Sequence, residues 1–279
     1  GLLRGCCLRE MQILDSKLLS KLAKVDIVNM TSRASASHIG SAFSVVDILS
    51  VLYSTILKIS PETVRSQNRD FLILSKGHAA AAQYAILANL GYFPKSFLDE
   101  YCQDDSMLGG HVNSSVPGIE LATGSLGHGM PYGIGIALAL QKQELDNRVI
   151  VVMSDGECDE GTTWESALIA NHHNLRNLTV VIDRNGLQSL TTTELTLKLE
   201  PFEQKWRAFG WKVEEVDGHS HEDLRKTLSI RNGPLCIIAN TIKGKGVDFM
   251  ENQISWHYKS PNSDEVKLAV QQIENYPYA

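Results

Sequence analysis

The sequence has little cysteine, no excess of positive charge and no long hydrophobic run. Its five cysteines are odd in number and contain no Cys-x-x-Cys pair, which argues against a disulfide framework and against a thiolate zinc site. A reducing compartment suits such a chain, so we expect a cytoplasmic protein.

Lysine and arginine number 26 against 32 aspartates and glutamates, which gives a net charge of −6. The sequence therefore lacks the basic footprint of a protein that binds nucleic acid or an anionic membrane surface. The apolar stretches at residues 132–140 and 149–153 are far shorter than the ~20 residues of a membrane span. We expect a soluble chain with neither nucleic acid nor membrane as a partner.

The first ten residues carry charges at Arg4, Arg9 and Glu10, and their apolar run is too short for a secretory signal. Met11 follows directly, so we interpret residues 1–10 as upstream or added sequence. Residues 11–279 contain no internal repeat, low-complexity tract or long flexible linker. We expect them to form a single domain.

Short Val/Ile/Leu runs alternate with helical patterns along the chain, which is typical of a parallel sheet covered on both faces. Apolar residues at three- and four-residue steps predict a leading helix over residues 15–34. We therefore expect an α/β fold, a doubly wound and mostly parallel sheet with helices on both faces. The predicted strands are 71–74, 149–153, 178–182, 211–216 and 234–239, the further helices are 44–57, 79–90, 162–173 and 221–228, and residues 201–211 and 252–264 are expected to be surface excursions.

Polar residues follow two of these strands. Asp155 comes directly after one strand, and Asn185 follows the next strand, one βα unit later. Because ligands bind at the carboxyl ends of parallel strands, the oxygens of the two side chains can converge on one cation. Such oxygens suit Mg²⁺ or Ca²⁺, and a Mg²⁺ site with few protein ligands borrows phosphate oxygens. The alternative is structural: Asp155 caps a helix and Asn185 begins a tight turn.

Four of the nine histidines lie at the ends of predicted elements, where they can face a common crevice: His38, His78, His111 and His257. Imidazoles hydrogen-bond sugar hydroxyls and phosphate oxygens, and they pass protons at neutral pH. The others are interpreted as hydrogen-bonded structural residues: His128, His172, His173, His219 and His221.

Two glycine-rich stretches need separate interpretation. Residues 124–129 have the spacing GxxGxG and follow no clear strand, so a dinucleotide-binding fingerprint is disfavoured. The basic turn at residues 243–246, Lys-Gly-Lys-Gly, is either a solvated loop or a phosphate contact.

The segment Ser154-Asp-Gly156, followed one βα unit later by Asn185, resembles the Gly-Asp-Gly…Asn signature of thiamine-diphosphate enzymes. Ser154 replaces the first glycine and removes no ligand. Five further motifs resemble the N-terminal half of transketolase in that family's order and spacing: Ala36-Ser-His38-Ile-Gly40, Leu74-Ser-Lys-Gly-His78-Ala, Gly109-Gly-His111, Thr123-Gly-Ser-Leu-Gly127 and Trp256-His257. The resemblance covers roughly residues 14–261 and implies the thiamine-diphosphate-binding fold of the PP type.

The same resemblance implies roles for individual residues. His38, His111 and His257 would be catalytic, with His111 on the donor sugar and the other two on the reacting carbonyl oxygen. Mg²⁺, with Ca²⁺ or Mn²⁺ as substitutes, would be held by Asp155, Asn185 and the carbonyl of Leu187. The thiamine diphosphate contacts would be His78, Gly124, Leu126, Asp155, Gly156, Glu157, Glu160, Asn185, Ile242 and His257, with Glu160 at a subunit interface.

The implied function is the N-terminal subunit of a split transketolase, a transferase that moves a two-carbon ketol unit from a ketose to an aldose. The family's pyrimidine-binding half and C-terminal domain have no counterpart here. A C-terminal subunit would supply them, in a heterotetramer with two copies of each chain, so this chain alone is expected to be silent. The alternatives are another two-chain thiamine-diphosphate enzyme, such as a 2-oxo-acid dehydrogenase component or a deoxyxylulose-phosphate synthase relative, and a non-catalytic cofactor-binding scaffold. The sugars, and whether they are phosphorylated, are left open.

Overall fold

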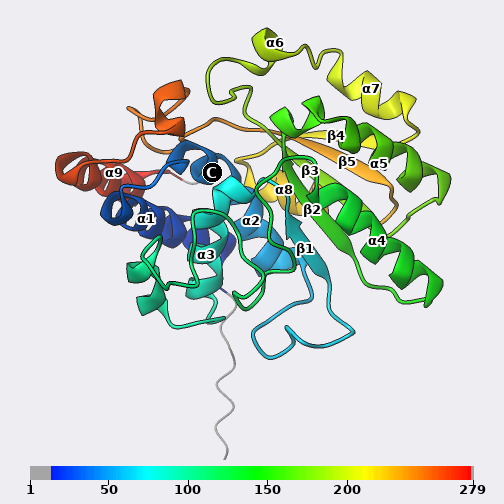
Figure 1. The fold of residues 1–279 in the computed structure, drawn as a ribbon, viewed down its shortest axis with the longest axis horizontal. Helices are drawn as coiled ribbons and strands as arrows, with labels where there is room; N and C mark the ends of the chain where they lie inside the picture. The colour runs from blue at the N-terminus through cyan, green and yellow to red at the C-terminus, as the bar shows by residue number, and fades with distance from the viewer. Residues whose placement is uncertain (1–13, 278–279) are drawn as a thin grey trace, which may run out of the picture.

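The computed structural model describes residues 14–277, and its strands form one parallel sheet (Figure 1). The strand order is β1-β2-β3-β5-β4, and every neighbouring pair is parallel. The strands are β1 Phe71–Leu74, β2 Val149–Ser154, β3 Leu178–Arg184, β4 Lys212–Asp217 and β5 Leu235–Asn240. The predicted parallel sheet is confirmed, because unbroken apolar runs suit strands that are buried on both faces.

Alternate residues of each strand point into two separate hydrophobic cores. Ile150 and Val152 belong to one core, whereas Val149 and Val151 belong to the other. On the first side lie α1 Ser16–Ala34, α2 Ile39–Val51, α3 Ala80–Asn89 and α8 His221–Leu228, and on the second lie α4 Gly129–Lys142, α5 Gly161–His172 and α7 Phe202–Ala208. The predicted doubly wound arrangement is therefore confirmed.

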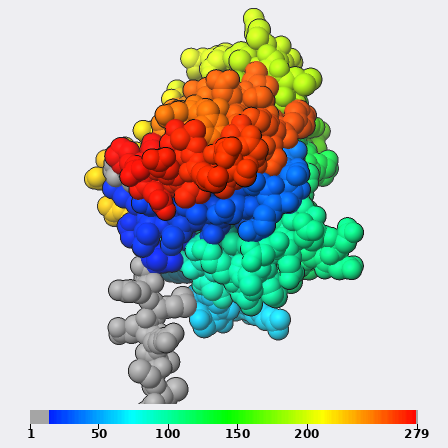
Figure 2. Space-filling model, turned by 90° about the vertical axis from the view of Figure 1, so that its left-hand side faces the viewer, coloured from blue at the N-terminus to red at the C-terminus, as the bar shows by residue number. Residues whose placement is uncertain are grey.

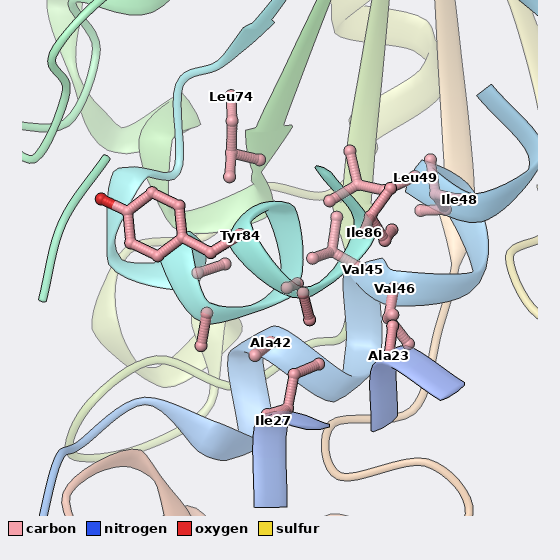
Figure 3. Close-up of a cluster of buried hydrophobic side chains, with 14 of the residues drawn as sticks. Ala23, Ile27, Ala42, Val45, Val46, Ile48, Leu49, Leu74, Tyr84 and Ile86 are labelled. Atoms are coloured by element: carbon pink, nitrogen blue, oxygen red, sulfur yellow. The ribbon is translucent and has the colours of Figure 1, made fainter. Parts of the chain in front are cut away.

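Three helices at the start of the fold form a dense apolar layer against the sheet (Figure 3). Ala23 and Ile27 of α1 meet Val46 of α2 and Ile86 of α3, all fully buried. Helix α1 begins at Ser16 because the Asp15 carboxylate accepts the N–H groups of Lys17 and Leu18. The C-terminal helix α9, Ser263–Asn275, packs against α1 from outside (Figure 2).

Helix α2 differs most from its prediction. It begins at Ile39, five residues before the predicted start at residue 44, and continues into a single π-turn at Leu52–Ile56. All 13 residues of α2 are buried, so its sequence has no polar face whose periodicity could mark the first turn. The consequence is that His38 directly precedes a helix, in a left-handed conformation with φ of 73°.

The span Ile39–Ile56 is also long and apolar enough to cross a membrane by length and composition alone, with a mean hydropathy of 1.6. Serines and Asp47 interrupt this run, so its sequence does not stand out as one continuous apolar stretch. In the fold, 83% of this span is buried inside the protein, as in the core helix of a globular domain.

The two predicted surface excursions are wrong in part. Residues 201–211 contain α7, whose Trp206 is fully buried, and the neighbouring Trp211 is buried as well. Residues 252–264 contain a short 3₁₀ helix, Ile254–His257, in which Trp256 is buried. Both segments are anchored by buried aromatic side chains. Their otherwise polar composition had led to the prediction of surface segments. The prediction about residues 1–10 lies outside the described residues.

Candidate active site

A cavity of about 280 Å³ opens where β2, β3 and β5 end, at the carboxyl edge of the sheet. Its lining contains most of the residues singled out from the sequence. The lining residues are His38, Ser41, Lys76, His78, His111, Gly124, Leu126, Ser154, Asp155, Gly156, Asn185, Leu187, Gln188, Ser189, Lys243, His257 and Tyr258. The expectation that polar residues after different strands meet in one place is therefore confirmed.

Four histidines cluster in this cavity around His38. The ring centroid of His38 lies 5.0 Å from that of His257, 5.4 Å from His78 and 5.7 Å from His111. The backbone N–H of His38 donates to the carbonyl oxygen of His257 at 2.8 Å, which ties the start of α2 to the 3₁₀ helix at Ile254–His257. Segments that are distant in sequence thus present their imidazoles to one space.

These imidazoles have depressed pKa values. Burial, together with the neighbouring His111, Lys243 and Lys76, lowers the pKa of His38 to about 4. Burial and Lys243 together lower the pKa of His257 to about 3. Burial also holds the pKa of His78 well below its usual range. At neutral pH these three rings are therefore uncharged, and each offers one hydrogen-bond donor and one acceptor.

The predicted metal ligands all line the cavity. Asp155 is buried, and its carboxylate accepts the N–H of Gly156 at 2.8 Å and that of Gly186 at 2.7 Å. The pKa of this carboxyl is raised to about 6, because burial and the nearby Asp183 raise it more than the Gly186 N–H lowers it. The Oδ1 atom of Asn185 accepts the N–H of Leu187, which folds the turn beside Asp155.

This donor set fits a divalent cation bound together with phosphate. Among residues 14–277, no three His, Cys, Asp or Glu side chains lie together in a way that could hold a metal. A cation next to Asp155 would therefore use the amide oxygen of Asn185, the carbonyl of Leu187 and oxygens of a ligand, a set that Mg²⁺ prefers.

Two buried lysines also line this cavity: Lys76, to which the sequence assigned no role, and Lys243, which belongs to the basic turn interpreted as a solvated loop or a phosphate contact. Lys76 pairs with the Asp183 carboxylate and donates to the carbonyl of Ser41. Lys243 donates to the carbonyls of Leu187 and Gln188 and lies 3.0 Å from Nδ1 of His257.

The solvated-loop interpretation of residues 243–246 is wrong for Lys243, which is only 1% exposed. Burial and the nearby Lys76 lower its pKa to about 8. In the sequence, each of the two lysines directly precedes a glycine, as Lys76-Gly and Lys243-Gly. This pattern was the sequence feature that could have pointed to both lysines as site residues.

The backbone of Gly124 approaches the histidine cluster closely. A Cβ atom on Gly124 would lie 3.0 Å from Cδ2 of His111, so a side chain at this position would displace that ring. Leu126 lies in the same loop, and α4 begins three residues later without a strand before it. The structure thus supports the rejection of a dinucleotide-binding fingerprint, which needs a strand directly before the glycines.

Three of the predicted cofactor contacts do not line the cavity: Glu157, Glu160 and Ile242. The buried Glu157 carboxylate accepts the hydroxyl of Ser75 and the N–H groups of Gly127 and Ser154, so it braces the loops around the site. Glu160 is exposed at the start of α5. Ile242 lies beside Lys243 and gives its N–H to His219.

The histidines interpreted as structural lie outside the cavity lining. Nδ1 of His128 contacts the carbonyl of Leu126 at 3.0 Å, and His172 and His173 stack edge to face at the end of α5. His219 and His221 both contact the Asp47 carboxylate. The four histidines predicted to face a common crevice therefore line the cavity, and the five interpreted as structural do not.

Comparisons with known proteins agree with this geometry. Residues 16–278 match the family described as transketolase, thiamine diphosphate binding domain. The chain is 40% identical over 266 residues to one of the subunits of the apulose-4-phosphate transketolase of Actinobacillus succinogenes, covering 94% of this chain and 96% of that protein. It is 38% identical over 242 residues to the SqwG subunit of the 6-deoxy-6-sulfo-D-fructose transketolase of a Clostridium species, covering 85% and 88% respectively.

Among solved structures, the transketolase of Campylobacter jejuni superposes with a TM-score of 0.84 at 27% identity. The match covers 96% of this chain but only 44% of that protein, so the chain spans less than half of this transketolase. The family match, the similarity to a transketolase subunit and the fold lead to one conclusion: the chain belongs to the transketolase family, as its thiamine diphosphate binding domain.

Proposed function

We propose that the chain is the thiamine-diphosphate-binding subunit of a two-chain transketolase, transferring a two-carbon ketol unit from a ketose to an aldose. The observation that carries this proposal is the cavity itself, which joins neutral histidines, two buried lysines and Asp155 at one sheet edge. Similarity to individual transketolase subunits over nearly their whole length favours the transketolase reaction over the other two-chain enzymes and over a scaffold.

The residues present fit thiamine diphosphate with Mg²⁺. Asp155, Asn185 and the Leu187 carbonyl would hold the cation, and Lys243 with His78 would hold the diphosphate. Lys243 suits an anion because its own contacts are with carbonyl oxygens and an imidazole, so its charge is not already neutralised by them. When bound, thiamine diphosphate supplies the thiazolium carbon that carries the two-carbon unit.

The histidines perform the remaining tasks. His38 and His257 hydrogen-bond the carbonyl oxygen of the sugar, and His111 binds a hydroxyl of the donor. Because His38 and His257 are neutral, each can donate a proton at one nitrogen while it accepts at the other. The bonds of Glu157 to Ser75 and Gly127 keep the surrounding loops in place.

A partner chain is the second part of the proposal. The connection after β3 carries three leucines that are 58–81% exposed, Leu190, Leu195 and Leu197, and α5 adds Leu168 at 57%. Exposed apolar side chains of this size near a cavity are typical of a protein interface. We expect two copies of each chain, with the partner's pyrimidine-binding domain supplying the acid that activates the cofactor, in a cytoplasmic protein.

The test is to co-express the chain with a neighbouring gene product that carries a thiamine pyrimidine domain, and to follow ketol transfer by mass spectrometry. The sugars for which the two relatives are named, a sugar phosphate and a sulfo-sugar, enter the donor screen. Turnover is expected only with both chains present. Robust turnover by the chain alone that His257→Ala abolishes would contradict the need for a partner.

A further inference from the structure

His219 bridges two parts of the fold, helix α2 and the turn that follows β5. Its Nδ1 lies 2.7 Å from Oδ2 of Asp47, and its Nε2 accepts the backbone N–H of Ile242 at 2.8 Å. Because an amide N–H can only donate, Nε2 must carry the lone pair, and the ring proton is on Nδ1. The two partners therefore fix both the tautomer and the orientation of the ring.

The loop that carries His219 is built for close contact with the next loop. His219 follows β4, and Ile242 follows β5, the neighbouring parallel strand. The N–H of Gly218 donates to the carbonyl of Asn240 at 2.8 Å. A Cβ atom on Gly218 would lie 2.4 Å from Cγ2 of Thr241, so glycine at this position permits the approach.

The other end of the bridge is anchored in α2. Asp47 is 2% exposed and also accepts hydrogen bonds from Ser20 and Lys24. Seven residues earlier, the carbonyl of Gly40 accepts the N–H of Gly244 at 3.1 Å. Helix α2 thus holds the turn after β5 on both sides of Lys243, directly through Gly40 and indirectly through His219.

The held turn determines where the Lys243 ammonium group lies. Its Cγ is 3.1 Å from the position that a Cβ on Gly40 would occupy, so the side chain runs closely over the start of α2 into the cavity. The adjacent peptide N–H, that of Ile242, is the one that His219 accepts. A shift of this peptide would move the base of the Lys243 side chain.

We propose that His219, oriented by Asp47, is a positioning residue that accepts the Ile242 N–H and thereby presents Lys243 to the diphosphate-binding part of the cavity. The proposal rests on the function proposed above. It gives a role to a histidine that the sequence analysis interpreted as structural only.

Two variants separate the two bonds of the ring. His219→Gln places an amide oxygen near the position of Nε2 and can still accept the Ile242 N–H. His219→Asn places an amide nitrogen near the position of Nδ1 and keeps only the bond to Asp47. His221→Asn is the matched control, because His221 also contacts Asp47 but its other nitrogen contacts Ser16 Oγ instead of the turn.

The binding of thiamine diphosphate with Mg²⁺ is measured by calorimetry on the two-chain complex. His219→Asn is expected to weaken binding by about tenfold, the scale of one lost hydrogen bond, whereas His219→Gln and His221→Asn stay within about threefold of the parent. Amide hydrogen exchange of peptides covering residues 240–250 is expected to rise in His219→Asn alone. Equal melting temperatures of His219→Asn and His221→Asn would separate positioning from stability.

Equal affinity of His219→Asn and the parent would overturn the inference, and so would equal losses in His219→Asn and His221→Asn. If His219→Asn does not fold, His219→Gln decides: parent-like affinity supports the inference, and a tenfold loss contradicts it. A parent complex that fails to bind the cofactor would instead contradict the proposed function, while the amide exchange would still test the bridge.

Discussion

Two clusters of buried and half-buried polar side chains lie close together in this protein, and their charges are compensated in different ways. The pocket cluster, His38, His78, His257, Asp155 and Lys243, keeps neutral imidazoles and a lysine whose contacts are uncharged. The Asp47 cluster, Ser20, Lys24, Asp47, His219 and His221, surrounds one carboxylate with donors.

The pKa values express the same contrast. Burial acts to raise the pKa of Asp47, but Lys24 and the hydrogen bonds from His219 and His221 hold it well below its usual range. In the pocket cluster burial dominates, so the pKa of Asp155 is raised and that of Lys243 is lowered. The charge of the Asp47 cluster is thus compensated by the cluster's own side chains. The pocket cluster, in contrast, suits a ligand that carries charges itself.

The largest effect is expected for Asp155→Ala. Removal of this carboxylate should weaken the coupled binding of Mg²⁺ and thiamine diphosphate by about 10³-fold, the scale of losing one partner of a buried charge pair, while the fold persists. Calorimetry on the two-chain complex measures the affinity, and circular dichroism measures the fold. The exposed Asp146→Ala is the control, and unchanged binding by Asp155→Ala would show that the metal assignment is wrong.

Asp47→Asn should act on stability instead. It removes the carboxylate that pairs with the buried Lys24, and the free energy of unfolding should fall by about 3 kcal/mol near pH 6. Because the folded pKa of Asp47 is depressed, its stabilisation is complete above the unfolded pKa of about 4 and is lost as the pH falls below it. Urea unfolding at pH 6 and pH 3.5 should therefore show a smaller difference from the parent at the lower pH.

The exposed Asp264→Asn serves as the control for this measurement and should change stability by less than about 0.5 kcal/mol. A difference between Asp47→Asn and the parent that grows on acidification would contradict the internal neutralisation of the Asp47 cluster.

Within the pocket cluster and its neighbour His111, the histidines should separate by role. His38→Ala and His111→Ala should leave cofactor binding nearly intact and lower turnover by about 10²-fold, the scale of a positioned proton-transfer group. His78→Ala, which removes a half-buried ring from the cavity lining, should instead weaken cofactor binding. Paired calorimetry and rate measurements compare the three variants, and identical behaviour would refute this division.

The smallest expected effect is that two histidines of the pocket cluster do not titrate near neutral pH. His38 and His257 should stay neutral from pH 8 down to pH 5, because burial and the nearby Lys243 depress their pKa values to about 4 and about 3. Carbon-detected NMR of histidine-labelled protein follows each ring, with His38→Gln and His257→Gln assigning the signals. A titration midpoint near pH 6.5 for either ring would show that the imidazoles of the pocket cluster are not held neutral, and would contradict the contrast with the Asp47 cluster.

The sequence by itself determined the sheet and the composition of the site. The central strands β2 and β3 each carry a run of buried apolar residues, and such a run can be recognised locally because a strand buried on both faces needs apolar residues at successive positions. The polar residues that follow these strands, such as Asp155 and Asn185, had to meet at one edge because parallel strands end together. The family motifs then gave the histidines their expected roles.

Only the tertiary structure decided how the charges are distributed. Helix α2 is buried all round, so its start and the strained position of His38 have no local signature. The burial of Lys243, the inward orientation of Glu157 and the bond from His219 to Asp47 join residues that lie far apart in the chain. Hydrogen bonds and desolvation depend on such long-range neighbours, whereas hydrophobic periodicity depends only on residues a few positions apart.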